Sequence, residues 1–199
     1  MSAHAYLIDD DEAIRDSLSW LLESRGVACR SYASAEEFLS AWNASLAGCI
    51  LLDIRMEGMS GPELFDVLNE RGNRLPVIFL TGHGDVPMAV SALKKGAFDF
   101  VEKPCNDNEL ANRVIEALQL DAKQRMAASD ADSVNTLIDR LSTRERQVME
   151  RILAGKLNKV IADELGISMR TVEVHRANVF EKMGVRTAVE LAQLVASRR

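Results

Sequence analysis

Five short apolar runs, separated by segments of helical periodicity, dominate the first 121 residues of the chain. Strands that alternate with helices pair in parallel, because each helix returns the chain to the same edge of the sheet by a right-handed crossover. The pattern therefore predicts an α/β domain with a five-stranded parallel sheet over residues 1–121. The expected strands lie near 4–8, 27–32, 48–52, 76–80 and 98–102, and the expected helices lie near 12–25, after Ser34, from Ser60 to about 71, and near 86–95 and 107–121.

Four of the apolar runs are closed by polar residues with the chemistry of a phosphoryl site. These residues are Asp9, Asp53, Thr81 and Lys103, with Asp10 beside Asp9. The carboxyl ends of parallel strands share one edge of the sheet, where α/β proteins bind ligands. Carboxylates can ligate Mg²⁺ or attack phosphorus, and a hydroxyl and an ammonium can stabilise phosphoryl oxygens. The alternative for the acidic residues at 9–11 is a solvated cluster at a helix start, but the agreement of four strand ends favours the phosphoryl site.

The net charge of −6 hides two regions of opposite sign. Residues 140–199 hold twelve Lys and Arg against seven Asp and Glu, a net charge of +5, and the rest of the chain carries −11. An acidic and a basic region in one chain indicate two domains with different partners. The basic region is a candidate for binding nucleic acid.

Two further features concern the cellular compartment. No apolar run is long enough to span a bilayer, and the N-terminus turns acidic at once, unlike a signal peptide. Cys29, Cys49 and Cys105 are odd in number and lack metal-ligand spacing, which favours reduced thiols. These features predict a cytoplasmic protein with no membrane partner.

The second half of the chain reads as helical throughout. Residues 122–139 are small and polar and are predicted to form a linker, with a helical extension at its start. Residues 140–199 predict an all-α domain of four helices, in which a short helix over 158–165, a turn at Gly166 and a longer helix over 169–183 form a helix-turn-helix.

The helix over 169–183 has an outward face suited to DNA. The apolar Val174 suits a thymine methyl group, and Glu173 can accept a hydrogen bond from cytosine N4. Positive charges and a hydroxyl on this face would contact phosphate and position the helix. The candidate DNA-binding residues are Arg170, Thr171, Glu173, Val174, Arg176, Ala177, Asn178 and Lys182. From these residues alone, a small helical bundle with a basic face remains an equal alternative.

The first region resembles the receiver domain of bacterial two-component response regulators. The resemblance covers residues 4–120 and rests on the runs at 8–12, 52–56, 59–61, 80–85 and 102–104. It implies a doubly wound sheet in the order 2-1-3-4-5. It also implies that Asp53 is the phosphoacceptor for a sensor histidine kinase, that Thr81 and Lys103 contact the phosphoryl group, and that Phe100 is a switch aromatic.

The same resemblance implies a Mg²⁺ cofactor. Its ligands would be Asp9, Asp10, Asp53 and the backbone carbonyl of Arg55. The chain departs from the family at Glu57, where a proline is usual. A more acidic and more flexible loop beside the phosphoacceptor would alter Mg²⁺ affinity or phosphoryl lifetime, but the favoured alternative is a loop variant without such an effect.

The second region is similar to the LuxR-type DNA-binding domain. The matching runs are residues 141–148, 158–162 and 168–176. A receiver joined to this domain is typical of the FixJ/NarL type of response regulator, and residues 81–90 and 172–184 are most similar to the FixJ branch. The resemblance implies that the helix over 169–183 enters the major groove of promoter DNA as part of a dimer.

These observations predict a phosphorylation-activated transcription factor and not an enzyme. Phosphorylation would drive formation of a homodimer through residues 86–121, and RNA polymerase is a further candidate partner. Two alternatives remain at this stage: a Mg²⁺-dependent phosphatase with an aspartyl-phosphate intermediate, and a DNA-binding protein that works without phosphorylation. The run Asp53-Ile54-Arg55 lacks the second acid usual in such phosphatases.

Overall fold

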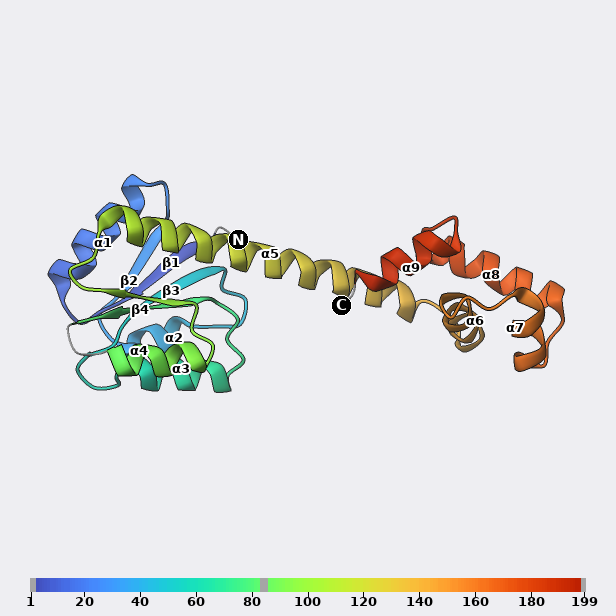
Figure 1. Ribbon diagram of the computed structural model, residues 1–199, viewed down its shortest axis with the longest axis horizontal. Helices are drawn as coiled ribbons and strands as arrows, with labels where there is room; N and C mark the ends of the chain where they lie inside the picture. The colour runs from blue at the N-terminus through green and yellow to red at the C-terminus, as the bar shows by residue number, and fades with distance from the viewer. Residues whose placement is uncertain (1–2, 83–85, 198–199) are drawn as a thin grey trace. The chain divides into compact units, whose positions relative to one another are not determined.

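The protein, seen in a computed structural model that describes residues 3–82 and 86–197, divides into two compact units (Figure 1). Unit 1 comprises residues 1–123 and unit 2 comprises residues 124–199. The strands of unit 1 are β1 (His4–Ile8), β2 (Cys29–Tyr32), β3 (Gly48–Asp53), β4 (Val77–Thr81) and β5 (Asp99–Glu102). Its helices are α1 (Glu12–Ser24), α2 (Ala35–Ala41), α3 (Gly61–Glu70), α4 (Val86–Lys94) and the first part of α5 (Asp107–Asp139).

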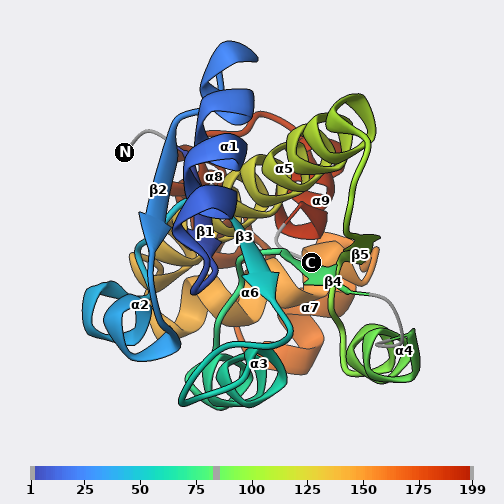
Figure 2. The ribbon, with the colours of Figure 1, turned by 90° about the vertical axis from the view of Figure 1, so that its left-hand side faces the viewer.

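The strands of unit 1 form one parallel sheet in the order β2-β1-β3-β4-β5 (Figure 2). This confirms the predicted fold class and strand order. The register places His4 opposite Gly48, and Asp53 opposite Leu80. All the strands therefore point their carboxyl ends toward one edge, as the parallel arrangement requires.

Helices cover both faces of the sheet, so the strands are buried on both sides. Along β3, Ile50 and Leu52 pack into one apolar layer, while Cys49 and Leu51 pack into the other. The first layer is completed by α2, α3 and α4, and the second by α1 and α5. Burial raises the pKa of the Cys49 thiol to about 12, which keeps this cysteine protonated and unreactive.

One glycine sets the distance between the end of β3 and the start of α3. The N–H of Gly61 donates to the carbonyl of Ile54 at 3.1 Å. A Cβ atom at this position would lie 2.1 Å from the carbonyl oxygen of Asp53. Only a residue without a side chain allows this approach.

Helix α5 is longer than the sequence pattern indicated. The expected helix ended near residue 121, but α5 continues to Asp139 through the segment predicted to be a linker. Residues 107–139 contain no Gly or Pro, and small residues such as alanine favour a helix as much as a linker. Val134 and Ile138, one helical turn apart, are buried in the core of unit 2. In the part of the chain that the structure describes, no helix combines the length and apolarity needed to cross a membrane.

Unit 2 contains the end of α5 and the predicted bundle. Its other helices are α6 (Thr143–Leu153), α7 (Asn158–Leu165), α8 (Met169–Met183) and α9 (Ala188–Ala196). Gly166 and Gly184 end α7 and α8 in the left-handed conformation. Ile161 and Ala162 occupy the buried face of α7, and the apolar Val160 beside them is 42% exposed.

Candidate phosphoryl site and nucleic-acid interface

The carboxyl edge of the sheet brings together the four strand-end residues. Asp9 follows β1, Asp53 ends β3, Thr81 ends β4 and Lys103 follows β5. The side chains of Asp9, Asp53 and Thr81 are buried, with 1%, 7% and 1% of their surface exposed. Buried polar groups need partners, so their contacts identify what the edge can hold.

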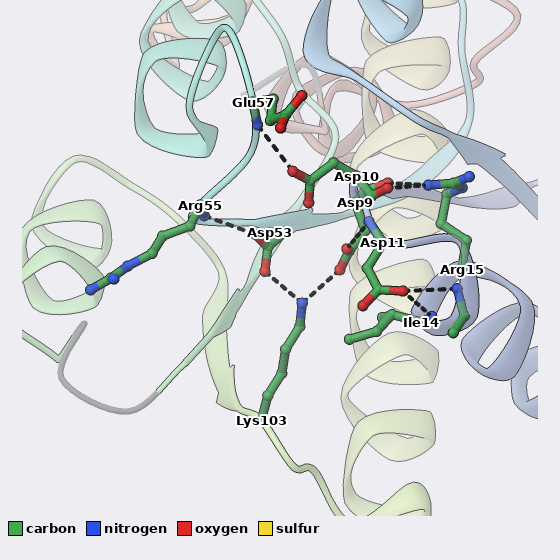
Figure 3. Close-up of polar contacts among 10 residues, drawn as sticks. Asp9, Asp10, Asp11, Ile14, Arg15, Asp53, Arg55, Glu57 and Lys103 are labelled. Carbon is green, nitrogen blue, oxygen red and sulfur yellow. Dashed lines mark hydrogen bonds and ion pairs between the residues drawn. The ribbon is translucent and has the colours of Figure 1, made fainter.

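The ammonium of Lys103 lies between two of these carboxylates (Figure 3). Its Nζ is 2.6 Å from Asp9 Oδ2 and 2.5 Å from Asp53 Oδ1. The backbone connects the same elements, since the N–H of Lys103 donates to the carbonyl of Thr81 at 2.6 Å. The Lys103–Pro104 peptide bond, which follows directly, is cis. Three distant segments of chain thus converge on one charge cluster.

Burial and charge shift the pKa values in this cluster. Burial raises the pKa of the Asp53 carboxyl, and the hydrogen bond and charge of Lys103 only partly oppose the rise. Burial alone would lower the pKa of Lys103, but its bonds to Asp53 and Asp9 raise it above the ordinary value. Lys103 therefore stays charged, and Asp53 holds a more basic carboxylate than an exposed aspartate.

Backbone N–H groups orient the carboxylates of the site (Figure 3). Asp53 Oδ2 accepts from the N–H of Arg55 at 2.8 Å, and Asp9 Oδ1 accepts from the N–H of Asp11 at 3.0 Å. Asp10 Oδ2 accepts from the N–H of Glu57 at 3.0 Å. Each carboxylate is therefore held at one oxygen by the main chain.

The acidic residues at 9–11 divide between the helix start and the phosphoryl site that the sequence analysis proposed for them. Asp11 is the N-cap of α1 and accepts from the N–H groups of Ala13 and Ile14 at 2.8 and 3.3 Å. Asp9 and Asp10 instead belong to the carboxyl edge. Arg15 Nη1 donates to the carbonyls of Asp9 and Asp10 at 2.8 and 2.9 Å, which holds the turn between β1 and α1.

Thr81 and Phe100, the two residues expected to respond to phosphate, lie near the same edge. The Thr81 hydroxyl is buried and finds no hydrogen-bond partner among residues 3–82 and 86–197. A buried hydroxyl without an acceptor is unusual in a native fold. Phe100 is half-buried and packs against the core layer formed with α2, α3 and α4. Residues 83–85, part of the motif at 80–85, lie outside the described residues.

Helix α8 presents most of the predicted DNA-binding residues to solvent. Val174 is 54% exposed, which is high for a valine in a packed bundle. Val172, Val179 and Met183 form its buried face, and Phe180 is half-buried. Of the candidate contacts, Arg170, Glu173, Val174, Ala177 and Lys182 are exposed, and Thr171, Arg176 and Asn178 are half-buried.

Two of the candidate phosphate contacts already have partners inside unit 2. Lys182 Nζ is 2.7 Å from Oε2 of Glu145, a buried side chain at the start of α6. This bond and the N–H of Ser142 hold the pKa of Glu145 at about 2. The Arg176 guanidinium lies 5.1 Å from the centre of the Phe180 ring and donates to Asn158 Oδ1 at 3.4 Å. Both cations therefore help to hold α8 against its neighbours.

A hollow beside α8 contains basic residues that the sequence interpretation missed. It has a volume of about 580 Å³, and Lys156, Asn158, Lys159 and Arg176 line it. Asn158 begins α7, so the helix N-terminus adds positive potential to that of the side chains. The pattern Gly155-Lys156-Leu157-Asn158-Lys159, a turn with two lysines before a helix, was the available signal.

Comparisons with known proteins agree with both units. Residues 5–115 match the response regulator receiver domain family, and residues 139–195 match the bacterial regulatory proteins of the luxR family. The chain is 48% identical over 196 residues to the C4-dicarboxylate transport transcriptional regulatory protein DctR of Rhodobacter capsulatus, covering 98% of this chain and 100% of that protein. It is also 48% identical over 193 residues to the transcriptional regulatory protein FixJ of Azorhizobium caulinodans, covering 97% and 92%.

Two solved structures extend the likeness to the fold. The response regulator StyR matches 98% of this chain and 99% of its own, with a TM-score of 0.89 and 39% identity. Full-length FixJ from B. japonicum matches 100% and 98%, with a TM-score of 0.63 and 41% identity. The chain therefore belongs to the two-component response regulators that combine a receiver domain with a LuxR-type DNA-binding domain, and it is a transcriptional regulator of that family.

Proposed function

We propose that this regulator is switched by phosphorylation of Asp53, with a sensor histidine kinase as the phosphoryl donor. The observation that carries the proposal is the cluster at the carboxyl edge. Lys103 lies 2.5 Å from Asp53, and the neighbouring Thr81 hydroxyl is buried with no hydrogen-bond partner among the residues that the structure describes. A phosphoryl group on Asp53 would supply a hydrogen-bond acceptor for Thr81 and a further anion for Lys103, beside the Asp9 carboxylate that Lys103 already binds.

The residues of the site fit this transfer. An oxygen of Asp53 forms a bond to phosphorus while the phosphorus–nitrogen bond of the donor breaks. The Lys103 ammonium offsets negative charge on the phosphoryl oxygens, and the Thr81 hydroxyl donates a hydrogen bond to one of them. Asp53 accepts one phosphoryl group. We therefore propose that the protein is a phosphoacceptor and not an enzyme with multiple turnovers.

The donor chemistry of the site fits a Mg²⁺ cofactor. Asp9, Asp10, Asp53 and the carbonyl of Arg55 are hard oxygen donors, and each carboxylate oxygen keeps a lone pair beyond its bond to the protein. Among the described residues, no three Asp, Glu, His or Cys side chains are already grouped so that they could hold a metal ion. When bound, Mg²⁺ would neutralise charge between the phosphoryl group and these carboxylates.

The proposed response is a shift between two conformations of unit 1. Movement of Thr81 toward phosphate would draw Phe100 inward and change the surface formed by α4, β5 and the first part of α5. Met88 and Val90 on α4 are exposed apolar side chains, 43% and 42% accessible, and suit a homodimer contact. A dimer of receivers would raise the effective concentration of the DNA-binding domains on paired half-sites.

In unit 2, α8 is proposed to enter the major groove of promoter DNA. Glu173, Val174, Ala177 and Asn178 would read base edges, whereas Arg170 and Thr171 would contact phosphate. Arg176 and Lys182 are also proposed to contact phosphate. They differ from Arg170 and Thr171 because each is bound to a side chain of another helix within unit 2. Lys156 and Lys159 of the hollow add to the phosphate contacts. RNA polymerase is a further candidate partner, and the proposed compartment is the bacterial cytoplasm.

The test is acetyl phosphate with Mg²⁺, followed by intact mass, sizing and DNA-binding measurements on wild type and Asp53→Asn. The expected result is one phosphoryl mass increment, a monomer-to-dimer shift and tighter DNA binding, all absent in the variant. An unphosphorylated wild type that binds DNA as tightly as the treated protein would contradict the switch. Excess phosphate release from generic phosphomonoesters would favour the phosphatase alternative.

A further inference from the structure

The turn between β3 and α3 contacts the carboxyl edge through its backbone. The N–H of Glu57 donates to Asp10 Oδ2 at 3.0 Å (Figure 3). Asp10 is the one exposed carboxylate among the proposed Mg²⁺ ligands, since Asp9 and Asp53 are buried. The surrounding core therefore does not hold the Asp10 side chain, and its orientation depends on this bond.

The turn itself is fastened by two further carboxylates. The N–H of Met59 donates to Glu36 Oε1 of α2 at 3.2 Å. The N–H of Ser60 donates to Glu63 Oε2, in the capping box of α3, at 2.9 Å. Gly58, which separates Glu57 from these two bonds, lies in the left-handed region, with φ of +77°. The Glu57 N–H is thus presented by a backbone held on its far side by α2 and α3.

We infer that the backbone N–H of Glu57 positions Asp10 for a divalent cation, so that the β3–α3 turn sets the affinity of the site for Mg²⁺. This inference rests on the proposed function and assigns a positioning role to a residue whose own side chain is exposed. Asp10 Oδ2 takes the N–H, and Oδ1 accepts no hydrogen bond from any residue that the structure describes. The free oxygen is therefore available to the cation while the bound oxygen fixes the side chain.

The direction of the effect follows from entropy. An exposed carboxylate without the bond would sample several rotamers, and binding a cation would have to select one of them. Ordering a side chain on binding lowers affinity by about three- to tenfold. Removing the N–H is expected to weaken Mg²⁺ binding by that factor. The rate of phosphorylation at saturating Mg²⁺ should change little, because Asp53, Thr81 and Lys103 remain in place.

The experiment compares Glu57→Pro with Glu57→Ala in the full chain. Both remove the carboxylate, but only proline removes the N–H. Isothermal titration with Mg²⁺ alone should give a dissociation constant about three- to tenfold higher for Glu57→Pro than for Glu57→Ala. The half-saturating Mg²⁺ concentration for acetyl phosphate labelling should rise by the same factor.

A second variant tests the turn without a proline. Glu36→Ala removes the acceptor of the Met59 N–H and touches none of the proposed ligands. It should weaken Mg²⁺ binding by about two- to fivefold, less than the proline variant, since the Glu57 N–H is loosened but not removed. Glu70→Ala, which removes an exposed acid at the end of α3, is the charge-matched control.

The possible outcomes distinguish a failure of the positioning role from a failure of the proposed function. No Mg²⁺ binding and no labelling in wild type would contradict the proposed function. Mg²⁺ binding in wild type with equal affinities for the proline and alanine variants, or for Glu36→Ala and Glu70→Ala, would overturn the positioning role alone. A proline variant that melts early leaves the pair Glu36→Ala and Glu70→Ala to decide.

Discussion

The carboxyl edge of unit 1 and the outer face of α8 hold charge in opposite ways. At the edge, the buried Asp9 and Asp53 and the half-buried Lys103 come from three distant strand ends, and Lys103 binds both carboxylates. On α8, one helix supplies the candidate contacts, and exposed residues such as Arg170 and Val174 point into solvent. The charges of a buried cluster must be paired within the protein before a ligand binds. The charges of an exposed face can be paired by the ligand itself. Substitutions should therefore damage folding and function together at the edge and separately on α8.

The largest effect is expected for Lys103→Met. Two buried carboxylates would lose their shared cation, and removing one partner of a buried ion pair lowers the free energy of unfolding by about 3 kcal/mol. Phosphoryl uptake should fall with it. Chemical denaturation of unit 1 without Mg²⁺ measures the loss. Lys95→Met is the control, because its pair with Asp66 is about half exposed, and that pair should contribute less than about 1 kcal/mol. Equal losses in both variants would remove the distinction.

Lys182→Met should behave like an edge substitution although it lies on α8. It leaves the buried Glu145 carboxylate without its cation, and the expected loss is about 2 kcal/mol in the free energy of unfolding of unit 2. The folded pKa of Glu145, about 2, lies below its ordinary value of 4.5. The stability from this pair is therefore present above about pH 4.5 and is lost as the pH falls toward 2. Acid titration of unfolding should show a shallower loss over this window in Lys182→Met; an unchanged slope would contradict the assignment.

Arg170→Ala should show the reverse behaviour. The side chain is exposed, so the free energy of unfolding should change by less than about 0.5 kcal/mol. DNA affinity should fall by about tenfold, and the slope of log affinity against log salt should decrease by about one phosphate contact. Fluorescence anisotropy at several salt concentrations measures both. An unchanged salt slope would place Arg170 away from the DNA backbone.

Val174→Ala should give the smallest effect and the most selective one. The loss of two exposed methyl groups should weaken binding to a preferred site by about 1 kcal/mol and leave binding to unrelated DNA unchanged. Competition between the preferred site and random duplex measures the difference. A uniform loss on all sequences would mean that Val174 contacts no base.

The edge could be predicted from the sequence because each of its main residues directly closes an apolar run. Periodicity locates the strand, the parallel sheet aligns the ends, and Asp53 and Lys103 follow. The bond from the Glu57 N–H to Asp10 could not be predicted, since a backbone donor leaves no sequence pattern. The partner of Lys182 could not be predicted either, because it depends on how α6 packs against α8.

The extent of α5 exposes a different limit. Small polar residues without Gly or Pro are compatible with both a linker and a helix, so composition did not separate them. Val134 and Ile138 decide the matter through a tertiary contact, since they fill the core of unit 2. The helical spacing of these apolar residues is present in the sequence, but the small and polar residues before them favoured a linker.

The close approach at Gly61 has a consequence for how mutational surveys of this protein are read. Any added side chain would collide with the main chain of Asp53, so the proposed phosphoacceptor would be displaced. Position 61 would then score as essential in a screen for transcriptional output, beside Asp53 and Lys103, although it carries no group that touches phosphate or metal. Position 61 would tolerate no side chain because its backbone lies close to that of Asp53. A list of essential positions therefore cannot by itself be read as a list of residues that take part in the chemistry.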